Sequence, residues 1–228
     1  MQVSNSSELL RAARLYVLVD GREACADFVQ LVQALVAAGV DVLQLRDKRL
    51  SDRDLAQRAR LLRQLTRDSA TLFIVNDRPD LAVLSEADGV HVGQDELTVA
   101  DCRKLVGPGR LVGVSTHDLG QARQAVADGA DYLGCGPTFP SSTKVFQDFP
   151  GLNFLRAVQA EIQLPAFAIG GIDTRNVAQV LDTGCRRIAV SAAVTTADDP
   201  AAAVRTLRST LGEHDDCNRS IAEARRTS

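Results

Sequence analysis

Short apolar runs alternate with amphipathic segments along almost the whole chain, and this alternation restricts the fold more than any other feature. The apolar runs are nearly continuous, as expected for parallel strands covered on both faces, and each precedes a segment with helical spacing of its apolar residues. Eight such pairs are present. The strand-like runs are 14–20, 40–47, 71–77, 88–93, 110–115, 131–136, 165–171 and 186–191, and the helix-like segments are 22–39, 50–69, 78–87, 97–107, 118–129, 151–162, 173–184 and 199–212.

Eight strand–helix units predict an α/β protein with a single (β/α)8 TIM barrel rather than a doubly wound open sheet. The length of 228 residues suits one large domain, and no linker interrupts the repeats. We therefore expect one domain over residues 1–228, with the barrel at 14–211. The remaining segment 212–228 is polar, and we expect it to be a frayed tail.

Charge and cysteine content exclude several classes of partner. The net charge of −3 leaves no global basic field for nucleic acid or an anionic membrane, and no apolar stretch approaches the roughly 20 residues of a membrane span. The first residues lack the apolar core of a signal peptide. The five cysteines form no CxxC pair, so we expect reduced thiols in a cytoplasmic protein and no zinc site.

Polar and charged side chains follow the predicted strands at their carboxyl ends, where TIM barrels hold their active sites. Gln44, Arg46 and Lys48 alternate as the second strand ends, so they share one face. The residues gathered at this rim are Gln44, Arg46, Lys48, Asn76, Asp77, Asp95, Glu96, Ser115, Gly170, Gly171, Val190 and Ser191.

This rim predicts a magnesium–diphosphate site, because Mg²⁺ favours one or two carboxylates together with phosphate oxygens. Arg46 and Lys48 would face the carboxylates of Asp77 and the Asp95-Glu96 pair. Capping of the next helix is the alternative, less favoured role for Asp77 taken by itself. The Gly-Gly turn after the seventh strand exposes backbone N–H groups before a helix, which favours phosphate binding, although a lone Gly-Gly is usually an ordinary turn.

Other features carry open alternatives. Residues 136–151 form the longest irregular connection, which indicates a lid or a passive surface insertion. His91 lies in an apolar run and is predicted to be a satisfied core histidine, whereas His117 is equally consistent with local capping. No Cys–His or Ser–His–Asp set is recognisable, so nucleophilic catalysis has little support.

The motifs "QLRDK", "VNDRPDLA", "GVHVGQDEL", "VGVSTH", "GCGPTFPSSTK", "FAIGGI" and "AVSAAV" together resemble the thiamine phosphate synthase family, from about residue 14 to 211. The resemblance implies two small-molecule substrates, a hydroxymethylpyrimidine diphosphate and a thiazole phosphate. Their condensation gives thiamine phosphate and pyrophosphate, with Mg²⁺ as cofactor. A homo-oligomer is left open by the sequence.

The resemblance also implies residue roles. Mg²⁺ would be held by Asp77 and by Glu96, with Asp95 as its competitor, and catalytic contacts would come from Arg46, Lys48, Ser115 and Lys144. The substrate-binding residues would be Gln44, Leu45, Arg46, Asp47, Lys48, Asn76 and Ser115 for the pyrimidine diphosphate, Ser141, Ser142, Thr143 and Lys144 for the loop that meets both substrates, and Gly170, Gly171, Val190 and Ser191 for the thiazole phosphate.

Two departures from the family pattern bear on these roles: the acid order "DE" after Gln94, and "VFQDFPG" after Lys144 where a more basic stretch is usual. Three other functions remain open. They are a thiazole tautomerase, which needs an acid–base residue, another phosphate-binding barrel, and a non-catalytic sensor of thiamine phosphate. The retained "QLRDK" and "ND" motifs disfavour the first two, and the paired carboxylates disfavour the third.

Overall fold

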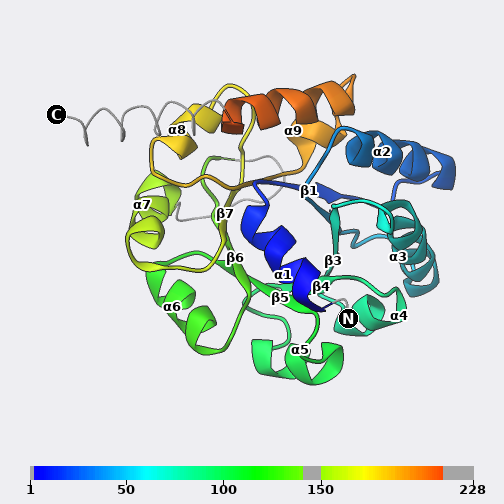
Figure 1. Ribbon diagram of the computed structural model, residues 1–228, viewed down its shortest axis with the longest axis horizontal. Coiled ribbons are helices and arrows are strands. Elements are labelled where there is room, and N and C mark those ends of the chain that lie inside the picture. The colour runs from blue at the N-terminus through cyan, green and yellow to red at the C-terminus, as the bar shows by residue number, and fades with distance from the viewer. Residues whose placement is uncertain (1–2, 141–149, 213–228) are drawn as a thin grey trace.

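A closed barrel of eight parallel strands forms the centre of the computed structural model, which describes residues 3–140 and 150–212 (Figure 1). Each strand pairs with its neighbours in chain order, and β8 closes the ring against β1. The predicted TIM barrel is confirmed. The strands are β1 (Leu15–Val19), β2 (Val42–Leu45), β3 (Leu72–Asn76), β4 (Gly89–Val92), β5 (Leu111–Thr116), β6 (Tyr132–Cys135), β7 (Ala166–Ile169) and β8 (Ile188–Val190).

Helices surround the barrel between successive strands (Figure 1). Several begin at polar caps; for example, the Ser51 hydroxyl accepts from Asp54 N–H, and the Thr98 hydroxyl accepts from Asp101 N–H. The helices are α2 (Cys25–Ala37), α3 (Asp52–Thr66), α4 (Pro79–Leu84), α5 (Val99–Val106), α6 (Leu119–Ala127), α7 (Gly151–Glu161), α8 (Val177–Leu181) and α9 (Ala192–Thr195), followed by helical residues 200–212. Among the described helices, none is both long and apolar enough to cross a membrane.

One helix was not expected. α1 (Val3–Ala12) precedes the first strand and lies across the middle of the ring in Figure 1. Because its chain enters β1 directly, α1 covers the end of the barrel where the strands begin. Leu10 and Ala13 are buried there against the barrel interior. Helix α1 follows no strand, so the alternating pattern did not reveal it.

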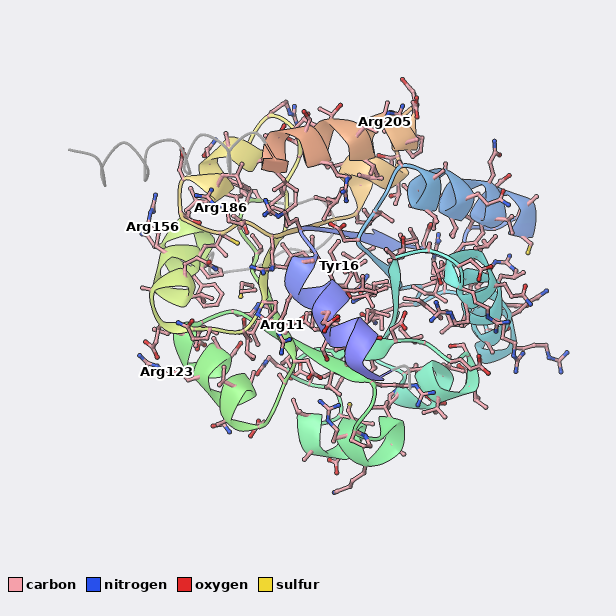
Figure 2. All side chains as sticks on the ribbon, in the orientation of Figure 1. Arg11, Tyr16, Arg123, Arg156, Arg186 and Arg205 are labelled. Carbon is pink, nitrogen blue, oxygen red and sulfur yellow. The ribbon has the colours of Figure 1, made fainter. Side chains whose placement is uncertain are left out.

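The apolar core has two parts. The larger part lies between the sheet and the helices, and the smaller one fills the barrel and includes Tyr16, Tyr132 and Phe167. Tyr16 lies beside α1 near the middle of the ring, whereas Arg123 and Arg156 lie at its periphery (Figure 2). Above this apolar layer, inward-facing positions become polar, with Gln44 and His91 buried in the interior. This change of polarity positions the site at the carboxyl ends of the strands.

Candidate active site at the carboxyl ends of the strands

The second strand places a buried amide beneath the rim. Gln44 is 2% exposed, and its Nε2 donates to the Tyr16 hydroxyl at 2.8 Å. Its Oε1 is buried without a hydrogen-bond partner among the described residues. Leu45 alternates to the other face and is buried in the outer core, so it offers a ligand only its backbone. A buried acceptor without a partner is costly, which points to a ligand N–H at Gln44.

Lys48 and Asp77 meet across the loops that follow β2 and β3. Lys48 Nζ lies 3.6 Å from Asp77 Oδ2, and the side chains are 61% and 22% exposed. Asp77 has a positive φ of 60°, and its N–H donates to the His91 carbonyl at 2.8 Å. The alternative that Asp77 caps the next helix is wrong, because the N-cap residue of α4 is Arg78, whose side chain makes no capping hydrogen bond. Backbone strain of this kind concentrates at functional sites.

Asp47 organises the loop that carries Lys48. Its carboxylate accepts hydrogen bonds from the N–H groups of Gly21, Arg49 and Leu50. Burial of Asp47 opposes its ionisation, but these backbone donors and the Arg49 side chain outweigh burial and lower the pKa of the carboxyl. The side chain of Asp47 is therefore occupied by its own loop and by the loop after β1, and any role toward a substrate belongs to its backbone.

The acidic pair after β4 lies beside the same opening. Glu96 folds back so that its carboxylate occupies the space that a Cβ on Gly93 would need, which places it at the end of the strand. Gln94 Nε2 donates to the Ser115 carbonyl at 2.6 Å and ties this loop to β5. Asp95 and Glu96 are both exposed. The described residues include no cluster of three or more metal-ligating side chains, yet two carboxylates suffice for Mg²⁺ held mainly by phosphate oxygens.

His91 connects the barrel interior to Ser115. Its Nδ1 lies 3.2 Å from the Tyr132 hydroxyl and its Nε2 lies 2.9 Å from Ser115 Oγ. Burial, and then the nearby Arg46 guanidinium, lower the pKa of His91 to about 4, so the ring is neutral at pH 7. The prediction of a satisfied, buried histidine is confirmed. Its bond to Ser115 was missed, although both residues occupy inward-facing positions of adjacent strands.

The Gly-Gly turn after β7 lies against the start of the long β6–α7 connection. Gly170 and Gly171 have φ values of 101° and 64°, and a Cβ on Gly171 would collide with the Pro140 carbonyl oxygen. Phe139 N–H donates to the Gly170 carbonyl at 2.9 Å. The next helix begins only at Val177. The turn thus precedes a helix as expected, but residues 172–176 separate the two, so phosphate binding here would depend on backbone N–H groups of the turn itself.

At the end of β8, Ser191 can present its side chain to a ligand, whereas Val190 can present only its backbone. The side chain of Val190 is 3% exposed and belongs to the outer core, whereas Ser191 is exposed and its hydroxyl donates to the Leu18 carbonyl at 3.1 Å. Arg22 lies nearby and donates to the Thr195 carbonyl at 2.5 Å. Arg22 was expected in a helix from residue 22, but α2 begins at Cys25, so sequence reasoning missed this loop cation.

Asn76 ends β3, where it pairs with His91 in the register of β3 and β4. The predicted residues Ser141, Ser142, Thr143 and Lys144 lie outside the described part of the chain, as does most of the predicted lid. The structure thus brings together at one rim the residues predicted from β2, β3, β4 and β5, namely Gln44, Arg46, Lys48, Asn76, Asp77, Glu96 and Ser115.

The fold and this rim define a (β/α)8 protein with cations and carboxylates at the carboxyl ends of its strands. The family model described as thiamine monophosphate synthase matches residues 15–194. The chain therefore belongs to the thiamine monophosphate synthase family, and the resemblance predicted from its motifs is confirmed.

Curated relatives and solved structures agree with this assignment. A thiamine-phosphate synthase of Rhodopirellula baltica is 49% identical over 82% of this chain and 52% of its own length. That of Chloroflexus aurantiacus is 47% identical over 86% of this chain and 91% of its own. The chain thus spans about half of the first relative and nearly all of the second. Thiamine phosphate pyrophosphorylase from Pyrococcus furiosus superposes with a TM-score of 0.80 at 34% identity, covering 90% of this chain and 98% of that one.

Proposed function

We propose that the protein is a thiamine-phosphate synthase, which joins a 4-amino-2-methyl-5-(diphosphomethyl)pyrimidine to a thiazole phosphate and releases pyrophosphate. Two observations at this rim carry the proposal together: the Lys48–Asp77 pair, and the buried Gln44 Oε1, which has no hydrogen-bond partner among the described residues. Such a site presents charge complementarity for a diphosphate and an acceptor for an aminopyrimidine N–H. Relatives named thiamine-phosphate synthase support the same activity.

The reaction replaces the bond between the pyrimidine methylene and its diphosphate with a bond to the thiazole nitrogen. The electron-rich aminopyrimidine stabilises positive charge on the methylene carbon, so the carbon–oxygen bond can break early. Arg46 and Lys48 would stabilise the negative charge that grows on the departing diphosphate. The second task is to hold the thiazole nitrogen in line with the methylene carbon. Neither step requires a strong general base from the protein.

We propose that Asp77 and Glu96 hold a magnesium ion. Its chemistry would be to neutralise the diphosphate as the carbon–oxygen bond breaks. Support for Glu96 over Asp95 comes from its carboxylate, which folds against Gly93 at the end of β4. The thiazole phosphate would lie against the backbone of Gly170, Gly171, Val190 and Ser191. Ser141, Ser142, Thr143 and Lys144 are assigned to the loop that meets both substrates by the family resemblance.

A cytoplasmic location is part of the proposal. It is supported by Cys25, Cys102, Cys135 and Cys185, which are all unpaired thiols in the structure. Burial, the largest influence, raises the pKa of Cys135 to about 12, so this thiol is unreactive.

The test is an end-product assay on the purified protein. Both substrates are supplied with Mg²⁺, each component is omitted in turn, and pyrophosphate and thiamine phosphate are quantified. We expect equal amounts of the two products only when all three components are present. Isomerised thiazole phosphate in the absence of the pyrimidine substrate would identify a tautomerase. Binding of thiamine phosphate with no turnover would identify a sensor.

A further inference from the structure

Five side chains form one hydrogen-bonded chain across the barrel interior. Gln44 Nε2 contacts the Tyr16 hydroxyl at 2.8 Å, the Tyr16 and Tyr132 hydroxyls are 3.1 Å apart, and Tyr132 lies 3.2 Å from His91 Nδ1. His91 Nε2 then contacts Ser115 Oγ at 2.9 Å. The chain links two predicted substrate-binding residues, Gln44 and Ser115, through three residues for which no part in substrate binding was predicted.

The barrel leaves room for this chain at two glycines. A Cβ on Gly113 would collide with the Tyr132 ring, and a Cβ on Gly134 would lie 3.2 Å from His91 Cε1. Tyr132 is 1% exposed and Tyr16 is 2% exposed. Burial is the largest cause that raises the pKa of both phenols, so both are neutral. Each of the two hydroxyls therefore carries one proton to donate, and water has little access to either.

Each hydrogen bond of the chain holds one proton, so the residues can donate along the chain in either of two directions. In the first, Gln44 donates to Tyr16, Tyr16 to Tyr132, and Tyr132 to His91 Nδ1. The neutral imidazole then carries its proton on Nε2 and donates it to Ser115 Oγ, so the serine proton points away from His91. In the second, every bond reverses, Gln44 presents its NH₂ group, and Ser115 gives its proton to His91.

Only the first direction matches the proposed substrate at both ends. It presents Gln44 Oε1, the buried acceptor without a partner among the described residues, to the amino group of the pyrimidine. It also leaves the Ser115 hydroxyl free to donate to a diphosphate, whose oxygens only accept. A reversed chain would set a donor against the amino group and would leave Ser115 unable to donate its proton to the diphosphate.

We propose that Tyr132 is a positioning residue that couples the two ends of this chain, so that Gln44 acts as an acceptor for the pyrimidine amino group while Ser115 acts as a donor to the diphosphate. The inference rests on the proposed function. Tyr132 occupies the middle of the chain, and its hydroxyl is the only described link between the Tyr16 and His91 side chains. Its effect on the substrate is transmitted through its neighbours.

The test replaces Tyr132 by Phe, which removes the hydroxyl and keeps the ring. Steady-state kinetics are measured with the 4-amino pyrimidine diphosphate and with its 4-oxo analogue, which lacks the amino donor. Wild type should strongly prefer the amino substrate, because a site built around a hydrogen bond rejects an analogue that lacks the group. Tyr132→Phe should lower that preference about tenfold or more and leave the KM for thiazole phosphate unchanged.

Phe167→Leu is the matched control. The Phe167 ring packs edge-on against Tyr16 at 5.3 Å and against Tyr132 at 5.9 Å, but it takes no part in the chain of hydrogen bonds. It should lower thermal stability and keep the wild-type preference. If Tyr132→Phe does not fold, Tyr16→Phe breaks the adjacent link and should show the same loss of preference.

The inference would be overturned if a folded Tyr132→Phe variant kept the wild-type preference or lost activity equally with both substrates. Turnover by the wild-type protein would still support the proposed function in that case. A wild-type protein that forms no thiamine phosphate would instead contradict the proposed function itself. The two failures are therefore distinguished by the same set of assays.

Discussion

Lys48 and Asp77 are held 3.6 Å apart by two different loops, one after β2 and one after β3. The Lys48 side chain is 61% exposed, and an exposed ion pair contributes only about 0–1 kcal/mol to folding. The pair is therefore better explained by ligand binding than by stability. A diphosphate with its metal ion would replace this contact: Lys48 would bind the phosphate oxygens and Asp77 would bind the metal ion.

Replacing Lys48 by Ala should lower turnover by about a hundredfold, the scale expected when one preorganised charge contact to the leaving group is lost. Arg46→Ala should behave in the same way, and both should leave thiazole phosphate binding nearly unchanged. Lys104→Ala is a suitable control, because Lys104 is an exposed lysine paired with Asp101 on α5. Turnover of each variant is compared with that of wild type under saturating Mg²⁺. A fully active Lys48→Ala protein would exclude the lysine from the chemistry.

The positive φ of Asp77 predicts that activity and stability separate at this position. Asp77→Gly relieves the backbone strain, so its free energy of unfolding should equal or exceed that of wild type by up to about 1 kcal/mol. Turnover should nevertheless fall sharply because a metal ligand is lost. Asp80→Gly, in the first turn of α4, should lower the free energy of unfolding and leave turnover unchanged. Urea unfolding and turnover are measured for both, and loss of stability in Asp77→Gly would argue for a structural role.

The acidic pair after β4 allows a direct comparison of two neighbouring carboxylates. Glu96 folds against Gly93 at the strand end, so Glu96→Ala should raise the Mg²⁺ concentration needed for half-maximal activity far more than Asp95→Ala. The longer side chain of Glu96 can reach the metal directly or through one of the waters that Mg²⁺ commonly keeps. The opposite ranking would show that Asp95 is the ligand.

Much of the fold could be predicted because each strand–helix unit repeats the same local pattern. Near-continuous apolar strands require cover on both faces. The alternation along β2 predicted that Gln44 shares a face with Arg46 and Lys48, and in the structure Gln44 is buried in the barrel interior. The rim residues followed because parallel strands bring all their carboxyl ends to one side.

Other features depend on contacts that no local pattern contains. Helix α1 is held by tertiary burial of Leu10 in the open end of the barrel, and the role of Tyr132 depends on β1 and β4 lying across the interior from β6. The side chain of Asp47 is held away from the site by three backbone donors, two in its own loop and one, Gly21, in the loop after β1. In each case the deciding partner is distant in sequence or belongs to the backbone.

The low pKa of His91 predicts a characteristic loss of stability in acid. Burial lowers the folded-state pKa to about 4, whereas an unfolded histidine titrates near pH 6.5. Between these values the unfolded chain binds a proton that the folded chain does not, so the free energy of unfolding falls as pH falls, by at most about 1.4 kcal/mol per pH unit. Urea unfolding of His91→Gln from pH 7 to 4.5 should lack this component, and parallel curves for variant and wild type would contradict the assigned pKa.

The most direct test of the proposed site is a crystal structure with Mg²⁺, pyrophosphate and thiamine phosphate. Pyrophosphate should lie against Arg46 and Lys48, with Mg²⁺ between it and the carboxylates of Asp77 and Glu96. The phosphate of thiamine phosphate should contact the backbone at Gly171 and Ser191, with the pyrimidine amino group at Gln44 Oε1. Pyrophosphate bound at another face of the barrel, or a metal ion that contacts neither carboxylate, would contradict the proposed site.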